Sequence, residues 1–199
     1  FLSKDQIVNI GWRSTDLRMS STEKNFKKYL LFCHNTNDHH IYKRIIQIWN
    51  ERLSESDCKL HVVNFNVARM NLNEITAKNI VIETSISQEN FESLFNLCGV
   101  HICLPEHDSF SHYLNQSMLC RSLIIIPDMD VFKELPLDSC GSVGEYAFCV
   151  TGKQTKHKTL VGNKFQFDTE SFVSQINGIN NIGSDTLSGL SDSARSDAL

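Results

Sequence analysis

The stretch VHICLPEHDSFSHYLNQSMLCRSLIIIP, Val100–Pro127, contains one complete unit of an alternating α/β fold. An apolar run opens it, a polar loop and an amphipathic segment follow, and an isoleucine-rich run closes it. Short apolar runs bounded by polar residues are typical of buried strands in a parallel sheet. The stretch therefore predicts a strand, a loop, a helix and a second strand, with the polar loop placed where the first strand ends.

The same alternation continues on both sides, which predicts an α/β fold with a doubly wound, mostly parallel sheet. We expect a connector over residues 1–22, a Rossmann-like lobe over 23–180 and a flexible polar tail over 181–199. A short strand and a final helix are expected within 163–180. The other strands are expected at 28–35, 59–65, 79–84, 100–105, 122–127 and 145–150, and the other helices at 40–53, 87–99 and 105–118.

Composition limits the classes of function. The chain has 199 residues, is 41% apolar and carries a net charge of −4, which gives no sign of a nucleic-acid or membrane surface. No apolar run reaches the roughly 20 residues of a membrane helix, and no secretory signal pattern opens the chain. Because it begins at Phe1 rather than Met, we expect a fragment or a processed product.

The cysteines point to a reducing compartment. Seven are present, mostly in or beside apolar runs, and no two form a CxxC pair. This pattern is typical of buried free thiols, so the predicted location is cytoplasmic.

Two polar loops should meet at one edge of the sheet, because parallel strands present their carboxyl ends together. HNTNDHH, 34–40, follows the first strand, and PEHDSFS, 105–111, follows the fourth. Ligands bind at such an edge, so these loops are the candidate site.

The first loop allows two interpretations. Its histidines and Asp38 are potential metal ligands, and DHH occurs in metal-dependent phosphoesterases, although adjacent histidines diverge and no companion motifs are present. A polar loop that caps the next helix through Asp38 is the simpler interpretation. Lys43 and Arg44, early in that helix, fit either a phosphate contact or a solvated helix face.

The second loop is also open to two interpretations. Glu106, His107, Asp108 and His112 fit acid–base chemistry or recognition of sugar hydroxyls. Acids and caps also gather at helix starts without any function. A nucleophilic role for Cys103 is disfavoured, because the residue lies within an apolar strand.

Residues 99–135 resemble the nucleotide-sugar-binding lobe of GT-B fold retaining glycosyltransferases, which include glycogen- and sucrose-type synthases. The stretch looks closest to glycosyltransferase-like proteins of large DNA viruses and bacteria, where the pattern reads roughly PSxxEGFGHYINEA, then TDxxPMNEL. The likeness extends more weakly over about residues 10–150. The matching positions are Gly99, His101, Pro105, Phe110, His112, Tyr113, Asn115, Asp128, Glu134 and Leu135.

The resemblance implies a hexosyltransferase-type enzyme that takes a sugar from a nucleotide diphosphate sugar, with no metal cofactor. Its partners would be a glycan or other acceptor and an N-terminal lobe absent from this chain, with no nucleic acid and no membrane span. The implied catalytic residues are Asp108 and Glu106, and the implied donor-binding residues are Gln116, Ser109, Phe110, Ser111, His40, Lys43 and Glu134.

The chain departs from the family pattern where the chemistry is concentrated. Asp108 and Gln116 replace two glutamates, Ser109 and Ser111 replace glycines, and the first loop lacks the family's basic pair. Three functions therefore stay open: an active donor-binding lobe, a degenerate non-catalytic module, and an unrelated hydrolase that uses the NDHH loop.

Overall fold

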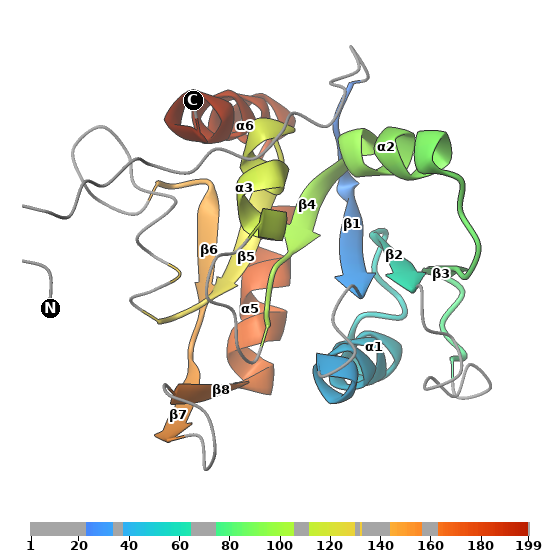
Figure 1. The fold of residues 1–199 in the computed structure, drawn as a ribbon, viewed down its shortest axis with the longest axis vertical. Coiled ribbons are helices and arrows are strands. Elements are labelled where there is room, and N and C mark those ends of the chain that lie inside the picture. The colour runs from blue at the N-terminus through green and yellow to red at the C-terminus, as the bar shows by residue number, and fades with distance from the viewer. Residues whose placement is uncertain are drawn as a thin grey trace, which may run out of the picture.

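The computed structural model describes residues 23–33, 38–64, 75–105, 112–129, 132, 144–156 and 163–198 of the chain. Within them, six strands form one parallel sheet in the order β3-β2-β1-β4-β5-β6, and two more form an antiparallel hairpin (Figure 1). The elements are β1 (Asn25–Cys33), α1 (His39–Arg52), β2 (Lys59–Asn64), β3 (Ile80–Glu83), α2 (Gln88–Leu97), β4 (Cys98–Ile102), α3 (His112–Leu119), β5 (Leu123–Pro127), β6 (Ala147–Val150), β7 (Gly152–Lys156), β8 (Asn163–Phe167), α5 (Thr169–Asn180) and α6 (Ser184–Ala198).

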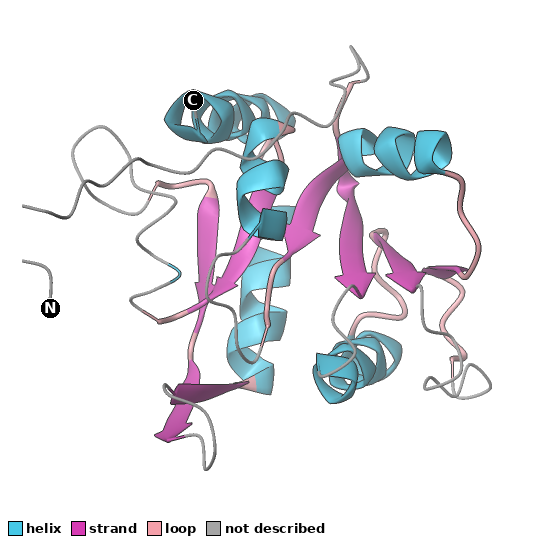
Figure 2. Cartoon of the chain, in the orientation of Figure 1, coloured by secondary structure: helices cyan, strands magenta, loops and turns pink. Residues whose placement is uncertain are grey.

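Helices cover both faces of the sheet (Figure 2). Side chains of a strand alternate between faces, so Tyr29 and Phe32 of β1 point in opposite directions. The Tyr29 ring packs on Trp49 of α1, whereas the Phe32 ring packs on Phe91 of α2 and Tyr113 of α3. Because α5 contacts α1 and α6 contacts α3, helices α1 and α5 share one face and α2, α3 and α6 share the other. The predicted doubly wound α/β fold is therefore confirmed.

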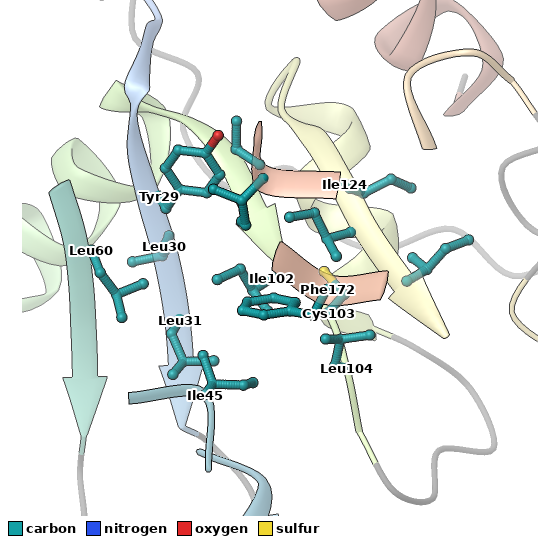
Figure 3. Packing of buried hydrophobic residues seen from close by; sticks show 14 of the residues in the cluster. Tyr29, Leu30, Leu31, Ile45, Leu60, Ile102, Cys103, Leu104, Ile124 and Phe172 are labelled. Carbon is teal, nitrogen blue, oxygen red and sulfur yellow. The ribbon is translucent and has the colours of Figure 1, made fainter. Parts of the chain in front are cut away.

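The core lies between the central strands and the two helix layers. Strands β4 and β5 are buried along their whole length, as expected for parallel strands with both faces covered. Figure 3 shows side chains from β1, α1, β2, β4, β5 and α5 meeting there. Removal of this apolar surface from water is the main stabilising contribution to the fold.

Most predicted elements are observed, with small shifts at their ends. The start of α2 is confirmed, because the Ser87 hydroxyl accepts a hydrogen bond from the Asn90 N–H at 3.2 Å. Its predicted end at Gly99 is wrong. The helix stops at Leu97, and Gly99 lies inside β4, where a Cβ atom would come within 2.7 Å of the Phe26 Cα. Gly99 is thus needed for close strand contact rather than as a helix cap.

The prediction of a flexible tail is wrong for residues 184–198, which form α6. The buried positions of this helix are Leu187, Ser191 and Ala194, spaced by four and three residues. Two of these side chains are small, so the sequence shows little apolar periodicity. Small residues nevertheless allow α6 to approach α3 closely.

The sequence pattern also gave no sign of β7. Every residue of this strand is exposed, so it lacks the alternation of apolar and polar residues by which a half-buried strand is recognised. Its partner β8 and helix α5 occur where a strand and a helix were expected.

Two glycine substitutions test the packing. Gly99→Ala should lower the free energy of unfolding by about 2–3 kcal/mol, because the new methyl group must displace backbone atoms of Phe26. Gly189→Ala in α6 should raise it by up to about 1 kcal/mol, because nothing lies within 4 Å of the added Cβ atom and alanine favours helix. Urea unfolding of both variants measures the two changes in unfolding free energy. Equal effects would contradict the close β1–β4 contact.

Candidate functional site

The carboxyl edge of the sheet brings together the segments that the sequence singles out. β1 ends at Cys33 and β4 at Ile102, and these strands are parallel neighbours. The chain then enters α1 on one face of the sheet and α3 on the other (Figure 1). The edge between β1 and β4 is therefore the topological switch point, where doubly wound proteins bind their ligands.

Three of the nine predicted site residues lie in the described part of the chain. His40 and Lys43 are exposed in the first turns of α1, and Gln116 is half-buried in α3. The two helices that carry them begin at the same edge, as predicted. The other six lie outside the described residues: Glu106, Asp108, Ser109, Phe110, Ser111 and Glu134.

The start of α1 differs in detail from the prediction. Asp38 occupies the N-cap position and is buried, but its side chain makes no capping hydrogen bond. The His39 and His40 rings lie edge to face, with centroids 5.8 Å apart. Nowhere in the described ranges do three His, Cys, Asp or Glu side chains gather as a set of metal ligands.

A buried polar chain fixes the position of α3. His101 of β4 is fully buried, with its Nδ1 2.8 Å from the Ser117 hydroxyl and its Nε2 3.1 Å from the Ser122 hydroxyl. Ser117 also donates to the Tyr113 carbonyl at 2.7 Å, within α3. At the other end, the Lys24 ammonium donates to Ser122 at 2.9 Å. These contacts connect the residue before β1 to β5, β4 and α3.

The Phe95 carbonyl also lies 3.1 Å from Nε2 of His101, and a carbonyl oxygen can only accept, so Nε2 carries the proton of a neutral ring. Nδ1 then faces the Ser117 hydroxyl, whose proton lies between Nδ1 and the Tyr113 carbonyl. Ser122 accepts from Lys24 and donates to the Cys98 carbonyl at 3.3 Å. Burial supports the neutral ring, because it lowers the pKa of His101 well below its ordinary value.

Aromatic rings enclose the imidazole. The Phe95 ring meets the His101 ring edge-on, with centroids 4.4 Å apart, and the Tyr113 ring is stacked parallel to it at 5.8 Å. The Tyr113 hydroxyl donates to the Leu30 carbonyl of β1 at 3.2 Å. His101 and Tyr113, which both contribute to the family resemblance, therefore hold the core of this domain together.

The end of α3 is closed by a Schellman motif. The Ser122 N–H donates to the Ser117 carbonyl and the Arg121 N–H to the Met118 carbonyl, while Arg121 adopts a positive φ of 61°. Helix α6 caps the same end, because Ser191 donates to the Arg121 carbonyl and Arg195 to that of Leu119. Helix α3 is thus fixed along its length.

The cysteines match the sequence interpretation where they are described. Six are free thiols; five of them are buried, and Cys149 is half-buried. Cys103 has only 4% of its surface exposed, as expected for an inert core thiol. No described helix is both long enough and apolar enough to cross a membrane.

Sequence reasoning missed Lys24, which is half-buried at the amino-terminal edge of the sheet. It donates to the carbonyls of Phe95 and Cys98 as well as to Ser122. The sequence did contain a signal for such a residue. His101 lies within an apolar run and Ser122 borders one, and a buried polar side chain at either position needs a hydrogen-bond partner.

Comparison with known proteins supports the fold rather than a close relationship. No family model and no curated protein matches the chain. Among solved structures, 94% of the chain superposes on a chain of the GtfA/B complex, with a TM-score of 0.66 and 11% identity. Sucrose-phosphate synthase from Thermosynechococcus elongatus gives 0.61 over 94% of the chain at 11% identity. The pneumococcal O-GlcNAc transferase GtfA, solved with UDP and GlcNAc, gives 0.57 over 94% at 12%.

These matches show that the chain has a Rossmann-like α/β fold, which it shares with part of each of these glycosyltransferase structures. The chain covers 36%, 46% and 35% of those three structures, so it spans about a third to a half of their length. Identities this low establish the shared architecture, and the activity has to be inferred from the site.

The polar chain predicts a specific pH dependence. Burial lowers the pKa of Lys24 from 10.5 to about 8. Between these values the unfolded chain binds more protons than the folded protein, so this group makes stability rise with pH. From pH 8 to pH 10, the wild-type protein should gain about 1–2 kcal/mol of unfolding free energy relative to Lys24→Met. Urea unfolding at both pH values measures this difference, and a difference independent of pH would contradict the proposed environment.

Proposed function

We propose that this chain is the donor-binding lobe of a glycosyltransferase that transfers a hexosyl group from a nucleotide diphosphate sugar with retention of configuration. The observation that carries the proposal is the switch point between β1 and β4, from which α1 and α3 begin on opposite faces. It is supported by superposition of nearly the whole chain on glycosyltransferases, one of them solved with UDP.

In the proposed reaction, the bond from the sugar C1 to the diphosphate oxygen breaks. A bond from C1 to an acceptor hydroxyl oxygen then forms on the same face of the sugar. The nucleoside diphosphate leaves, and the proton of the acceptor hydroxyl is released. The residues proposed beside the sugar and phosphates are Asp108 and Glu106, with Ser109, Phe110, Ser111 and Glu134 in donor contacts.

The diphosphate needs positive charge, because stabilisation of a departing anion is a large part of such catalysis. We propose that the amino end of α1, with His40 and Lys43, supplies it without a metal ion. Both side chains are exposed on the first turns of that helix, which begins at the carboxyl edge of the sheet. UDP binding should then be unaffected by EDTA.

The nucleotide ribose is proposed to contact Gln116. The residue is half-buried one turn into α3, whose position is fixed by the polar chain beneath it. An uncharged amide holds a ribose hydroxyl more weakly than a carboxylate does, so donor affinity should be modest. The rest of the proposed enzyme is an N-terminal lobe, which would contribute the acceptor site, and its proposed location is the cytoplasm, where free thiols persist.

The alternative is a degenerate domain with a structural or interaction role. It is motivated by the replacement of both family glutamates and by the lack of a basic pair in the loop after β1. Calorimetric titration of the protein with UDP-, GDP- and ADP-sugars separates the two. Binding at or below millimolar ligand supports the donor lobe, and no binding to any of them at that concentration supports the module.

Gln116→Glu should tighten UDP binding about 3–10-fold, because a carboxylate accepts hydrogen bonds from the ribose more strongly than an amide. Gln88→Glu is the matched control: it makes the same charge change at an exposed position of α2 and should leave the affinity unchanged. Calorimetry with both variants measures the effect. Unchanged affinity in Gln116→Glu would remove this residue from the site.

Lys43→Gln should weaken UDP binding about 3–10-fold and reduce its salt dependence, because one cation facing the diphosphate is lost. Binding of uridine, which has no phosphate, should be unaffected. If both ligands lost affinity equally, Lys43 would have a structural role rather than a phosphate contact.

A further inference from the structure

The β7–β8 hairpin concentrates positive charge in an acidic protein. Residues 151–167 contain four lysines and no aspartate or glutamate, although the whole chain has a net charge of −4. β7 continues from β6 after the single residue Thr151, so the hairpin lies at the carboxyl edge of the sheet (Figure 1). It is therefore on the same edge as the proposed donor site, yet no role in donor binding accounts for its charge.

The hairpin is firmly attached at its base. The Asp168 N–H donates to the Thr151 carbonyl at 2.8 Å, and the Thr151 N–H donates to the Ser171 hydroxyl at 2.9 Å. Arg44 of α1 lies over the Phe167 ring, 4.7 Å from its centroid, and donates to the Thr169 hydroxyl at 3.0 Å. These contacts connect the hairpin to both α1 and α5.

One face of β8 packs against the domain, whereas every residue of β7 is exposed. Phe165 and Phe167 are only 2% and 3% exposed, so Lys164 and Gln166, between and beside them, lie on the opposite face. In the register, Lys164 pairs with Thr155, and Gln166 pairs with Lys153. We call Lys153, Thr155, Lys164 and Gln166 the outer face. Lys164 is half-buried, and the other three residues are exposed.

This outer face has a distinct chemistry. It carries two cations and two neutral side chains that form hydrogen bonds, with no aromatic or aliphatic side chain among them. Absence of apolar anchors disfavours insertion into a membrane, and absence of aromatic rings disfavours stacking with nucleic-acid bases. The overall negative charge of the chain also opposes a densely charged polyanion. A saccharide with widely spaced acidic groups suits both the lysines and the hydrogen-bonding residues.

We infer that the outer face of the β7–β8 hairpin binds an acidic saccharide chain. The inference deepens the proposed function, on which its biological meaning rests, by assigning the acceptor to the class of carboxylate-bearing glycans. The N-terminal lobe would hold the reacting end of such a glycan, and the hairpin would hold a more distant part of it. The hairpin would hold such a chain beside α1, whose first turns carry the proposed diphosphate contacts, His40 and Lys43.

The test compares oligogalacturonate with an uncharged malto-oligosaccharide of the same length, by calorimetry with the full chain at low and moderate salt. Oligogalacturonate should bind with an affinity that falls as salt rises, and the neutral oligosaccharide should not bind. The double variant Lys153→Gln/Lys164→Gln should lose about tenfold in affinity. The matched control is Lys59→Gln/Lys78→Gln, two exposed lysines away from the hairpin, which should change affinity less than twofold.

Several results would overturn the inference. They are equal losses in both double variants, equal binding of the neutral oligosaccharide, no binding of oligogalacturonate, and tighter binding of anionic lipid vesicles or duplex DNA. Circular dichroism and urea unfolding verify that the variants fold. UDP titration is a separate measurement. If UDP fails to bind while oligogalacturonate binds as expected, the proposed function is wrong, and the inference that the hairpin binds an acidic saccharide is still supported.

Discussion

The neutral imidazole of His101 lies at the centre of the sheet with none of its surface in water, so each polar atom around it needs a protein partner. An unpaired buried donor or acceptor costs about 1–3 kcal/mol. Lys24, Ser122, His101 and Ser117 meet this requirement as one hydrogen-bonded chain, and Phe95 and Tyr113 enclose the ring. A shift of β4, β5 or α3 relative to the others would break several of these bonds at once. This row of hydrogen-bonded side chains therefore fixes how the three elements are arranged.

That arrangement determines what the carboxyl edge can do. Helix α3 is fixed beneath by His101 and at its end by the Schellman motif and α6, while α1 is joined to the hairpin and α5 through Arg44 and Arg52. Two rigid helices therefore begin on opposite sides of the β1–β4 switch point. A rigid edge of this kind suits a donor lobe, and the same anchoring holds the basic hairpin beside it.

Parts of the site could be predicted from the sequence because local pattern determines them. Apolar runs located β1, β4 and β5, and parallel pairing then required the loops after β1 and β4 to share an edge. Lys24 and Ser191 could not be predicted, since their importance comes from partners 98 and 70 residues away in the chain. Helix α6 was missed for a related reason: Ser191 and Ala194 are buried by contact with α3 rather than by their own hydrophobicity.

The sequence by itself determined the alternation of strands and helices, the position of the candidate loops and the excess of lysine in residues 151–167, because these depend on residue type and spacing. Tertiary structure decided which polar residues belong to the core and which face outward. His101 and Tyr113 are buried partners, Gly99 permits close contact between β4 and β1, and the burial of Phe165 and Phe167 places Lys153 and Lys164 on the opposite face of the hairpin. The physical reason is that burial and hydrogen bonding depend on neighbours from distant parts of the chain, which residue type and spacing do not specify.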